Sequence, residues 1–365
     1  MDFDFSDDQR QLQESLRRFL TRECTSRTVR QIFEGDRSYD AELWTGLAKL
    51  GFTGTAIAEE YGGAGLGYLE LCLVMEELGR ALAPVPFITS ICLFAEAVKL
   101  AGSAEQKLRY LPSIADGTCI GTFAAAQEKN AARVRGERLT GVTTAVADGL
   151  AADFAVVSAY DGDELALYIA GLHDAGATRT RLEAIDPSSK FARIVFKDVP
   201  VEPLGPRGAG ETLRRQLYDR AAVLIAFAQI GGAFRALEMA RDYALDRYAF
   251  GRAIGSFQAI KHMLADMYVS AALARGNANF AVWALDSASS ELPVAAAAAR
   301  LAATSAFQLC AKNNIQVHGG IGFTWEMDCH LFYRRSNTLA LTVGSGSTWE
   351  ARLVERLISS EEVRA

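Results

Sequence analysis

The chain has 365 residues, of which 50% are hydrophobic and 22% are charged, and its formal net charge is -6. This length suits two or three domains that each bury a core, and the composition is typical of an ordinary soluble acidic protein. The acidic balance argues against broad contact with nucleic acid or with an anionic membrane, because both bind clustered positive charge.

The N-terminus and the cysteines narrow the cellular setting. The first residues, Met-Asp-Phe-Asp-Phe, have neither the basic region nor the apolar core of a secretion signal or a transit peptide. No apolar run approaches the roughly 20 residues that cross a bilayer, so we expect no membrane span and a cytoplasmic location. The six cysteines are scattered, without a Cys-x-x-Cys pair or a Cys/His cluster, which predicts reduced thiols and no metal site.

The N-terminal part of the chain has the pattern of a helical bundle. Ser6 to Gln9 fits a capping box and precedes apolar residues at helical spacing, which predicts an amphipathic helix. Residues 59–67 are too rich in glycine for regular structure. Three more helical segments are predicted: one that runs into Gly51, one over 68–82, and one over 87–111 that is broken at Gly102 and ended by Pro112.

Around residue 120 the pattern changes to short apolar or alternating runs separated by Gly, Asp and Ser. Such runs predict a small β-domain, either a sheet or a barrel. They cover residues 120–126, 154–158, 165–170 and 192–196.

Long Ala- and Leu-rich helical patterns return at about residue 211. They cover residues 213–245, 260–285, 292–314 and 351–360. The sequence therefore predicts an α+β protein that is mainly α. We expect an N-terminal α-helical domain over residues 1–119, a middle β-domain over 120–208, and a C-terminal α-helical domain over 209–365.

Three pieces of sequence in the N-terminal part carry a family resemblance. They are Glu-Glu-Tyr-Gly-Gly-Ala-Gly-Leu-Gly at 59–67, Glu-Glu-Leu-Gly-Arg at 76–80, and Gly-Ser-Ala-Glu-Gln-Lys at 102–107, followed by Arg-Tyr-Leu-Pro at 109–112. In this order they resemble the N-terminal helical domain of the acyl-CoA dehydrogenase family, and the resemblance covers nearly the whole chain. It implies an N-terminal helical bundle, a small middle β-domain and a C-terminal four-helix-bundle-like domain. It also implies FAD as cofactor and α,β-desaturation of an acyl-CoA thioester as the reaction.

The stretch from Arg247 to Gln258 carries a chemical signal of its own. An arginine suits a diphosphate, Phe250 offers an apolar face to an aromatic ring system, and Gly251 allows a tight turn. A structural turn between two helices explains the same residues. In the acyl-CoA dehydrogenase family the matching Arg, Phe and Gln reach the FAD of a neighbouring subunit. The resemblance therefore implies FAD contacts for Arg247, Phe250 and Gln258, and it implies an oligomer.

A second glycine-rich stretch starts at Gln316, after a long predicted helix. A glycine cluster alone is a weak signal for phosphate binding, because turns use the same residues. The stretch resembles the family's Gln-x-x-Gly-Gly-x-Gly, which implies contacts from Gln316, Gly319 and Gly320 to the adenine and diphosphate side of FAD. The same resemblance implies a cofactor contact at Ser347. His318 is expected to be a hydrogen-bonded structural residue.

The implied reaction needs a desolvated carboxylate that removes a proton from the carbon next to the thioester. In most of the family this Glu lies just before a Gly-Thr segment, and Ser345, which cannot act as that base unaided, occupies the matching position. Some members place the Glu at the start of a helix directly before an Arg, which matches Asp219 and Arg220. Asp219 is thus the candidate base, with a helix N-terminal cap as the alternative role and with Ala221 or Ala222 at the position in an ungapped register. Arg220 is a candidate contact for a coenzyme A phosphate.

The middle domain departs from the family pattern. Where members carry a Thr-Glu pair and a Gly-Ser-Asp turn, this chain reads Ala124 to Asn130, and Gln127 is a candidate hydrogen-bond partner for the flavin edge. The next strand has Thr143 and Thr144 without the usual Trp. These departures concern the substrate pocket rather than the fold.

Four hypotheses follow. The chain is an FAD-dependent acyl-CoA dehydrogenase with an unusual base, or it is the base-lacking partner in a heteromeric dehydrogenase whose second chain supplies the Glu. Family members of this mixed kind act in sterol degradation, which makes a bulky acyl substrate conceivable. The third hypothesis is a flavin oxidase or hydroxylase, because fold alone does not fix the reaction. The fourth is an assembly protein that has lost the cofactor. The dehydrogenase hypotheses imply acyl-CoA as substrate and electron-transfer flavoprotein or a similar acceptor as partner.

Overall fold

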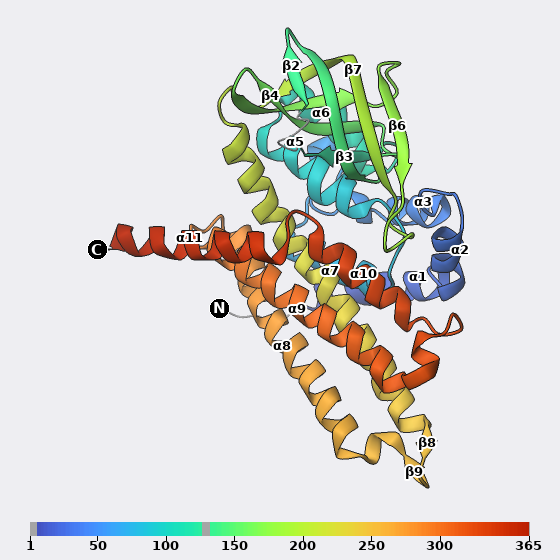
Figure 1. The fold of residues 1–365 in the computed structure, drawn as a ribbon. Helices are drawn as coiled ribbons and strands as arrows, with labels where there is room; N and C mark the ends of the chain where they lie inside the picture. Colours follow the sequence, from blue (N-terminus) through green and yellow to red (C-terminus); the bar gives the residue numbers. More distant parts are fainter. Residues whose placement is uncertain (1–5, 126–131, 365) are drawn as a thin grey trace. The chain divides into compact units, whose positions relative to one another are not determined.

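The computed structural model describes residues 6–125 and 132–364, with side chains to residue 359 (Figure 1). The chain divides into two compact units. One unit, called the helical unit below, contains Met1–Val29, Tyr68–Ala83 and Ala222–Ala365. The other, called the mixed unit, contains Arg30–Gly67 and Pro84–Ala221.

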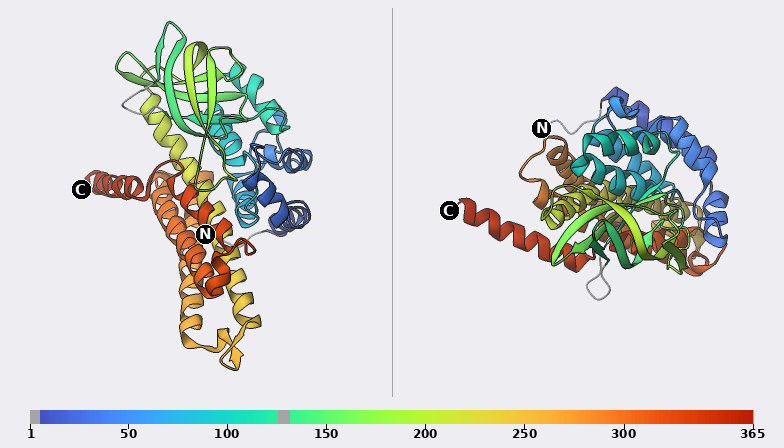
Figure 2. Two further views of the ribbon diagram at one scale, coloured as in Figure 1. Left: turned by 45° about the vertical axis from the view of Figure 1, so that its right-hand side comes forward. Right: turned by 90° about the horizontal axis from the view of Figure 1, so that it is seen from above.

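The helical unit is built from long helices. Helix α9 packs against α8 and α10. Helix α11 also contacts α9, and its C-terminal end extends away from the other helices (Figure 1 and Figure 2). The helices of this unit are α1 (Asp7–Glu23), α4 (Tyr68–Arg80), the part of α7 (Gly210–Asp246) that follows Ala221, α8 (Gln258–Asp286), α9 (Leu292–His318), α10 (Cys329–Leu341) and α11 (Gly346–Arg364).

Two local features explain how α1, α4 and α7 form and pack. The Ser6 hydroxyl accepts the Gln9 N–H and the Gln9 side chain returns to the Ser6 N–H, so the expected capping box is confirmed. Helices α4 and α7 approach closely through two glycines. A Cβ at Gly79 would lie 1.9 Å from the carbonyl oxygen of Ala228, and a Cβ at Gly231 would lie 1.9 Å from that of Glu76. Glycine is therefore required at this crossing.

The mixed unit combines short helices with the sheet. A π-helix over Ile88–Ala95 continues directly into α5, and its residues from Thr89 onward are buried. The other helices are α3 (Ala41–Lys49), the 3-10 turns η1 (Phe52–Gly54) and η2 (Glu59–Tyr61), α5 (Glu96–Ala101), α6 (Ala104–Ala115) and the first part of α7; α2 (Ser26–Glu34) crosses the boundary between the units.

In the described residues the sheet of the mixed unit has seven strands, and their pairings close into a ring, as in a small barrel. β4 pairs with β2 and β5, while β7 pairs with β3, β5 and β6. The strands are β1 (Gly121–Ala124), β2 (Arg133–Arg135), β3 (Arg138–Ala147), β4 (Phe154–Asp161), β5 (Glu164–Gly171), β6 (Ala177–Leu182) and β7 (Phe191–Leu204). The π-helix lies close against β1, because a Cβ at Gly121 would lie 2.2 Å from Cγ of Phe94.

The predicted fold class, α+β and mainly α, is confirmed. Within it, several local expectations change. Pro112 lies inside α6 instead of ending it, because the Asp116 N–H still donates to the Pro112 carbonyl at 3.0 Å. α2, α10, β2 and β6 were not anticipated as separate elements, whereas the expected strand with Thr143 and Thr144 is β3. The bounds of the three proposed domains stay a prediction.

Two helical segments are long and apolar enough to cross a membrane by length and composition, Gly210–Asp246 and Leu292–Phe323. The expectation that no apolar run approaches that length is therefore wrong. Their most apolar windows are 72% and 56% buried within the protein. Core helices of globular proteins pass the same test, so the finding is weak evidence for a membrane span.

Candidate functional site

The stretch from Arg247 to Gln258 folds as a short hairpin between α7 and α8. Strand β8 (Tyr248–Ala249) pairs with β9 (Arg252–Ala253) across a turn whose two central residues both have positive φ, 53° at Phe250 and 80° at Gly251. Such a turn suits the twist of a hairpin, but a left-handed backbone is unusual for a bulky residue. The Phe250 ring is 95% exposed and makes an edge contact with Phe257 at 6.2 Å between centroids. The hairpin therefore presents an aromatic ring to the outside of the helical unit.

Arg247 and Gln258 flank this hairpin. The Arg247 carbonyl accepts the Ile254 N–H at 2.8 Å, which closes the base of the loop. The side chains of Arg247 and Gln258 are both exposed, and within residues 6–125 and 132–359 no ion pair is found for the Arg247 guanidinium. Gln258 is the first residue of α8, where Phe257 provides no side-chain cap. An exposed arginine thus lies near a helix N-terminus without a side-chain cap, a combination that suits an anion.

The second glycine-rich stretch closes α9. Gln316 is exposed in the last turn, and the Gly319 N–H donates back to the Gln316 carbonyl. Gly319 has φ of 63°, which glycine adopts without strain. A Cβ at Gly319 or Gly320 would meet no protein atom within 4 Å, so the backbone here is open to a ligand.

His318 joins the two stretches at one end of the bundle. Its ring stacks on Tyr243, near the end of α7, with centroids 4.2 Å apart. Burial lowers the pKa of His318, so the ring is neutral and its Nδ1–H donates to the Asn314 carbonyl at 2.8 Å. Since Arg247 follows Tyr243 by one helical turn, and Gly319 follows His318, the stack brings the hairpin and the glycine loop to the same end of the helical unit. This geometry agrees with a structural role for the histidine.

Ser345 caps the last helix of the chain. Its Oγ accepts the Thr348 N–H at 3.3 Å and lies 2.9 Å from both Ser347 Oγ and Thr348 Oγ1. The Trp349 N–H donates to the Ser345 carbonyl at 3.1 Å, as in the first turn of a helix. Ser347 is exposed in that turn. The hydroxyl of Ser345 therefore serves as the N-cap of α11.

Asp219 and Arg220 lie in the mixed unit, on α7. The helix begins at Gly210, so Asp219 is well inside it, and the alternative role as an N-terminal cap is wrong. Asp219 is 5% exposed. The Arg220 guanidinium lies 3.5 Å from the buried carboxylate of Glu96, which also accepts a hydrogen bond from Lys99 at 2.5 Å. Arg220 is therefore part of a charge cluster that the sequence did not suggest. Gln127 lies outside the described residues.

Models of one family match both ends of the chain. The acyl-CoA dehydrogenase N-terminal domain matches residues 6–118, and the acyl-CoA dehydrogenase C-terminal domain matches residues 208–357. Acyl-CoA dehydrogenase IpdE2 from Mycobacterium tuberculosis (strain ATCC 25618 / H37Rv) is 34% identical over 362 residues, which cover 97% of each protein. The chain is a member of the acyl-CoA dehydrogenase family. The resemblance inferred from the sequence is thereby confirmed, and the chain belongs to a family of oxidoreductases that act on CH–CH groups.

Solved structures of two complexes contain chains that are similar in fold to this one. The ChsE4-ChsE5 complex from Mycobacterium tuberculosis contains a chain with a TM-score of 0.90 and 28% identity, covering 98% of this chain and 99% of that one. A chain of a Tcur3481-Tcur3483 steroid ACAD variant has a TM-score of 0.89 and 29% identity over 98% of this chain and 99% of that one.

Sequence reasoning missed a polar cluster inside the helical unit of this family member. Arg300 on α9 is 1% exposed and hydrogen bonds to Gln229 on α7 and to two carbonyls at the end of α10. The signal was present, because Arg300 is the single charged residue between positions 294 and 311. A lone cation in an alanine-rich helix is either exposed or paired inside the protein, and the sequence could not say which.

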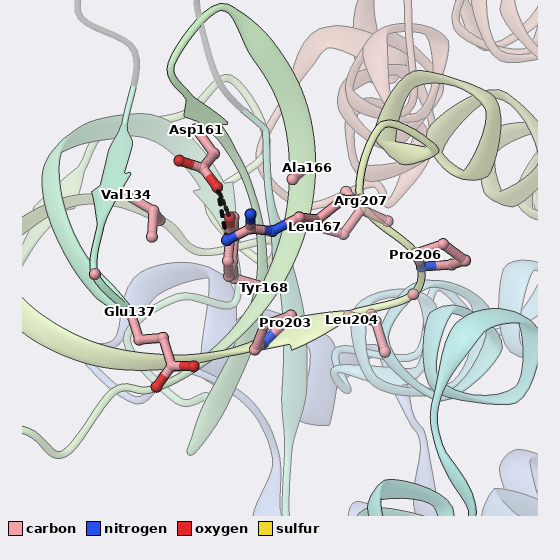
Figure 3. Close-up of a pocket in the computed structure, with 12 residues that line it drawn as sticks. Val134, Glu137, Asp161, Ala166, Leu167, Tyr168, Pro203, Leu204, Pro206 and Arg207 are labelled. Carbon is pink, nitrogen blue, oxygen red and sulfur yellow. Dashed lines mark hydrogen bonds and ion pairs between the residues drawn. The ribbon is translucent and has the colours of Figure 1, made fainter.

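A separate pocket of about 340 Å³ opens in the mixed unit, between strands of the sheet and the loop before α7 (Figure 3). Asp161 lies on one side, 3.7 Å from the Arg207 guanidinium and 3.5 Å from the Tyr168 hydroxyl that donates to it (Figure 3). Among the described residues, none of those proposed from the sequence as site residues lines this pocket. It is therefore distinct from the hairpin and the glycine loop.

Proposed function

We propose that this protein is an FAD-dependent acyl-CoA dehydrogenase that works as one subunit of a heteromer. In this proposal it supplies part of the FAD-binding surface, while a second dehydrogenase chain supplies the catalytic carboxylate. The observation that carries the proposal is the role of Ser345: where most of the family places a glutamate, this chain has a serine whose hydroxyl caps α11.

The residues at the end of the bundle fit a dinucleotide. We assign Arg247 to the diphosphate, because its guanidinium is exposed and no carboxylate is paired with it in the described part of the chain. Phe250 offers a fully exposed ring, and Gly319 and Gly320 leave backbone without side-chain cover. Gln258, Gln316 and Ser347 add exposed polar groups on the same unit. FAD, when bound, accepts the hydride that leaves the β-carbon of the acyl group.

Phe250 also argues for a second subunit. The ring at the tip of the hairpin stays 95% exposed despite its edge contact with Phe257, and a left-handed backbone at that residue adds a cost. Both features have a reason if the hairpin reaches into a neighbouring chain. The similar chains in the ChsE4-ChsE5 complex and the Tcur3481-Tcur3483 steroid ACAD support a second, different chain as that neighbour.

The base, the substrate and the acceptor complete the proposal. Asp219, which is buried in α7, would be the base only in the alternative in which this chain acts without a second chain. Arg220 is proposed to meet a coenzyme A phosphate, although its guanidinium now lies near Glu96. We propose an acyl-CoA as substrate, and a bulky one by analogy with the steroid ACAD. The proposed electron acceptor is electron-transfer flavoprotein or a similar protein. The proposed location is the cytoplasm.

The cofactor assignment is tested by FAD titration of the protein alone and of its complex with the second chain. Arg247→Gln is expected to weaken FAD binding by about tenfold or more, because a charge-assisted hydrogen bond to phosphate contributes about 1.5–3 kcal/mol. Arg241→Gln is the matched control, since Arg241 is an exposed arginine near the end of α7 that pairs with Asp242. Equal FAD affinity of Arg247→Gln and the wild type would remove the diphosphate assignment.

Two alternatives give different results in the same preparation. A flavin oxidase or hydroxylase would consume oxygen in step with substrate, whereas a dehydrogenase passes electrons to an added acceptor under anaerobic conditions. An assembly protein without cofactor would show no flavin absorbance after purification with added FAD, either alone or in the complex.

A further inference from the structure

Arg300 is a buried cation without a paired carboxylate in the described part of the chain. Its Nη1 donates to Gln229 Oε1 at 2.5 Å, and its Nη2 donates to the carbonyls of Leu339 and of Thr342, the latter at 2.8 Å. Gln229 is itself fully buried, and its Nε2 donates to the Thr304 hydroxyl at 3.1 Å. Burial lowers the pKa of Arg300 to about 9, which still leaves the guanidinium charged at neutral pH. Such a group persists only where its hydrogen bonds offset the loss of water.

The two carbonyls belong to a helix end that lacks the usual stop signal. α10 ends at Leu341, and the residue after its C-cap is Val343, with φ of 57°. This position normally holds glycine, because a β-branched side chain is strained in the left-handed region. Gly344 follows with φ of 119°. The turn has one backbone hydrogen bond of its own, from the Gly344 N–H to the Leu341 carbonyl at 3.2 Å, and contacts from elsewhere in the chain can offset the strain at Val343.

Arg300 provides that support in two ways. Its guanidinium donates to the carbonyl of the C-cap residue Thr342 and to that of Leu339, which also accepts the Thr342 N–H at 3.3 Å. Its positive charge also lies at the negative end of the α10 dipole. Gln229 accepts the other side of the fork, which fixes the orientation of the guanidinium plane.

We propose that Arg300 is a positioning residue that holds the turn over residues 342–345 and thereby sets where α11 begins. On the proposed function, Ser347 in the first turn of α11 contacts the cofactor, so Arg300 acts on the site through the turn that precedes it. The Cβ position of Gly344 is 3.4 Å from Nε1 of the buried Trp349, so the turn is confined on its other side by the first turn of α11.

Hydrogen exchange of individual amides tests the positioning role without any cofactor. Arg300→Met should raise the exchange of the Gly344, Thr348 and Trp349 amides by about tenfold relative to amides in the middle of α9. Arg300→Lys should give a smaller increase, because an ammonium can still reach a carbonyl but not all three acceptors. Arg179→Met is the matched control, since Arg179 also donates to two backbone carbonyls, in the mixed unit.

A second substitution separates positioning from a general loss of packing. If the strained turn is what Arg300 supports, Val343→Gly in the Arg300→Met background should return the exchange of these amides toward the wild-type value. A cavity or an unpaired Gln229 would not respond to that change. Unchanged exchange at the turn in Arg300→Met, or no rescue by Val343→Gly, would overturn the proposal. If Arg300→Met does not fold, Arg300→Lys is measured instead, and unchanged amide exchange at the turn in that variant would also overturn the proposal.

The cofactor readout distinguishes this inference from the function on which it rests. In the FAD-loaded complex, Arg300→Met should weaken FAD binding and Val343→Gly should partly restore it. If the wild-type complex binds no FAD, the proposed function fails while the exchange result still decides the role of Arg300. If the turn loosens and FAD affinity is unchanged, Arg300 positions the turn but not the site, and the inference about the site is wrong.

Discussion

Replacing Ser345 separates a helix cap from a catalytic group. The Ser345 hydroxyl accepts the Thr348 N–H at 3.3 Å, and Ser345→Ala removes this acceptor. Loss of a serine N-cap costs about 1 kcal/mol, which corresponds to about a fivefold increase in the opening equilibrium of the first turn of α11. Ser345→Asp should keep the cap, because aspartate is as good an N-cap as serine and its charge suits a helix N-terminus.

Two measurements on these variants give the outcome. Hydrogen exchange of the Thr348 and Trp349 amides should increase about fivefold in Ser345→Ala and stay near wild type in Ser345→Asp. Dehydrogenase turnover of the heteromer should change by less than about fivefold in Ser345→Ala, because the hydroxyl takes no part in proton transfer. A loss of turnover of several hundredfold with a normal helix start would refute this reasoning and make Ser345 catalytic.

Two further predictions concern stability. Gly231→Ala should destabilise the helical unit by about 1–3 kcal/mol, measured by urea unfolding, because the new Cβ would lie 1.9 Å from the Glu76 carbonyl oxygen. Gly276→Ala, on α8, is the control. A Cβ there would meet no protein atom within 4 Å, so this change should stabilise the unit by up to about 1 kcal/mol. Equal effects of the two would contradict the close helix crossing. Burial and the Glu202 carboxylate raise the pKa of Tyr110 to about 12. The native state therefore keeps a proton that the unfolded chain loses above pH 10, so the free energy of unfolding should fall between pH 10 and 12. Tyr110→Phe should remove this part of the fall. In a titration followed by tyrosinate absorbance at 295 nm, the same variant should lack one ionisation at high pH.

Much of the fold could be predicted because its signals are local. The Ser6 capping box, the glycine stop at Gly102 and the alternating runs of the β-domain each depend on a few neighbouring residues. α10 was missed because polar and charged residues such as Arg335 interrupt its apolar pattern, although Arg335 is buried in the structure. Periodicity does not register a buried arginine that is satisfied by its surroundings.

The candidate site was less predictable because its geometry depends on residues far apart in sequence. The motifs at Arg247 and Gly319 were visible, but the stack between Tyr243 and His318 that brings them to one end of the bundle was not. The resemblance put Asp219 at a helix start, whereas the helical pattern over 213–245 put it inside a helix, and α7 begins at Gly210. The roles proposed for these side chains stay predictions until ligand binding is measured.

The central claim is that this chain lacks its own base and works with a second dehydrogenase chain. The most direct measurement is anaerobic reduction of bound flavin by a panel of acyl-CoAs, with this chain alone and with a candidate second chain that carries the glutamate. The account predicts no reduction with this chain alone, reduction after mixing, and loss of that reduction when the partner's glutamate is changed to glutamine. Full flavin reduction by the pure chain would contradict the account.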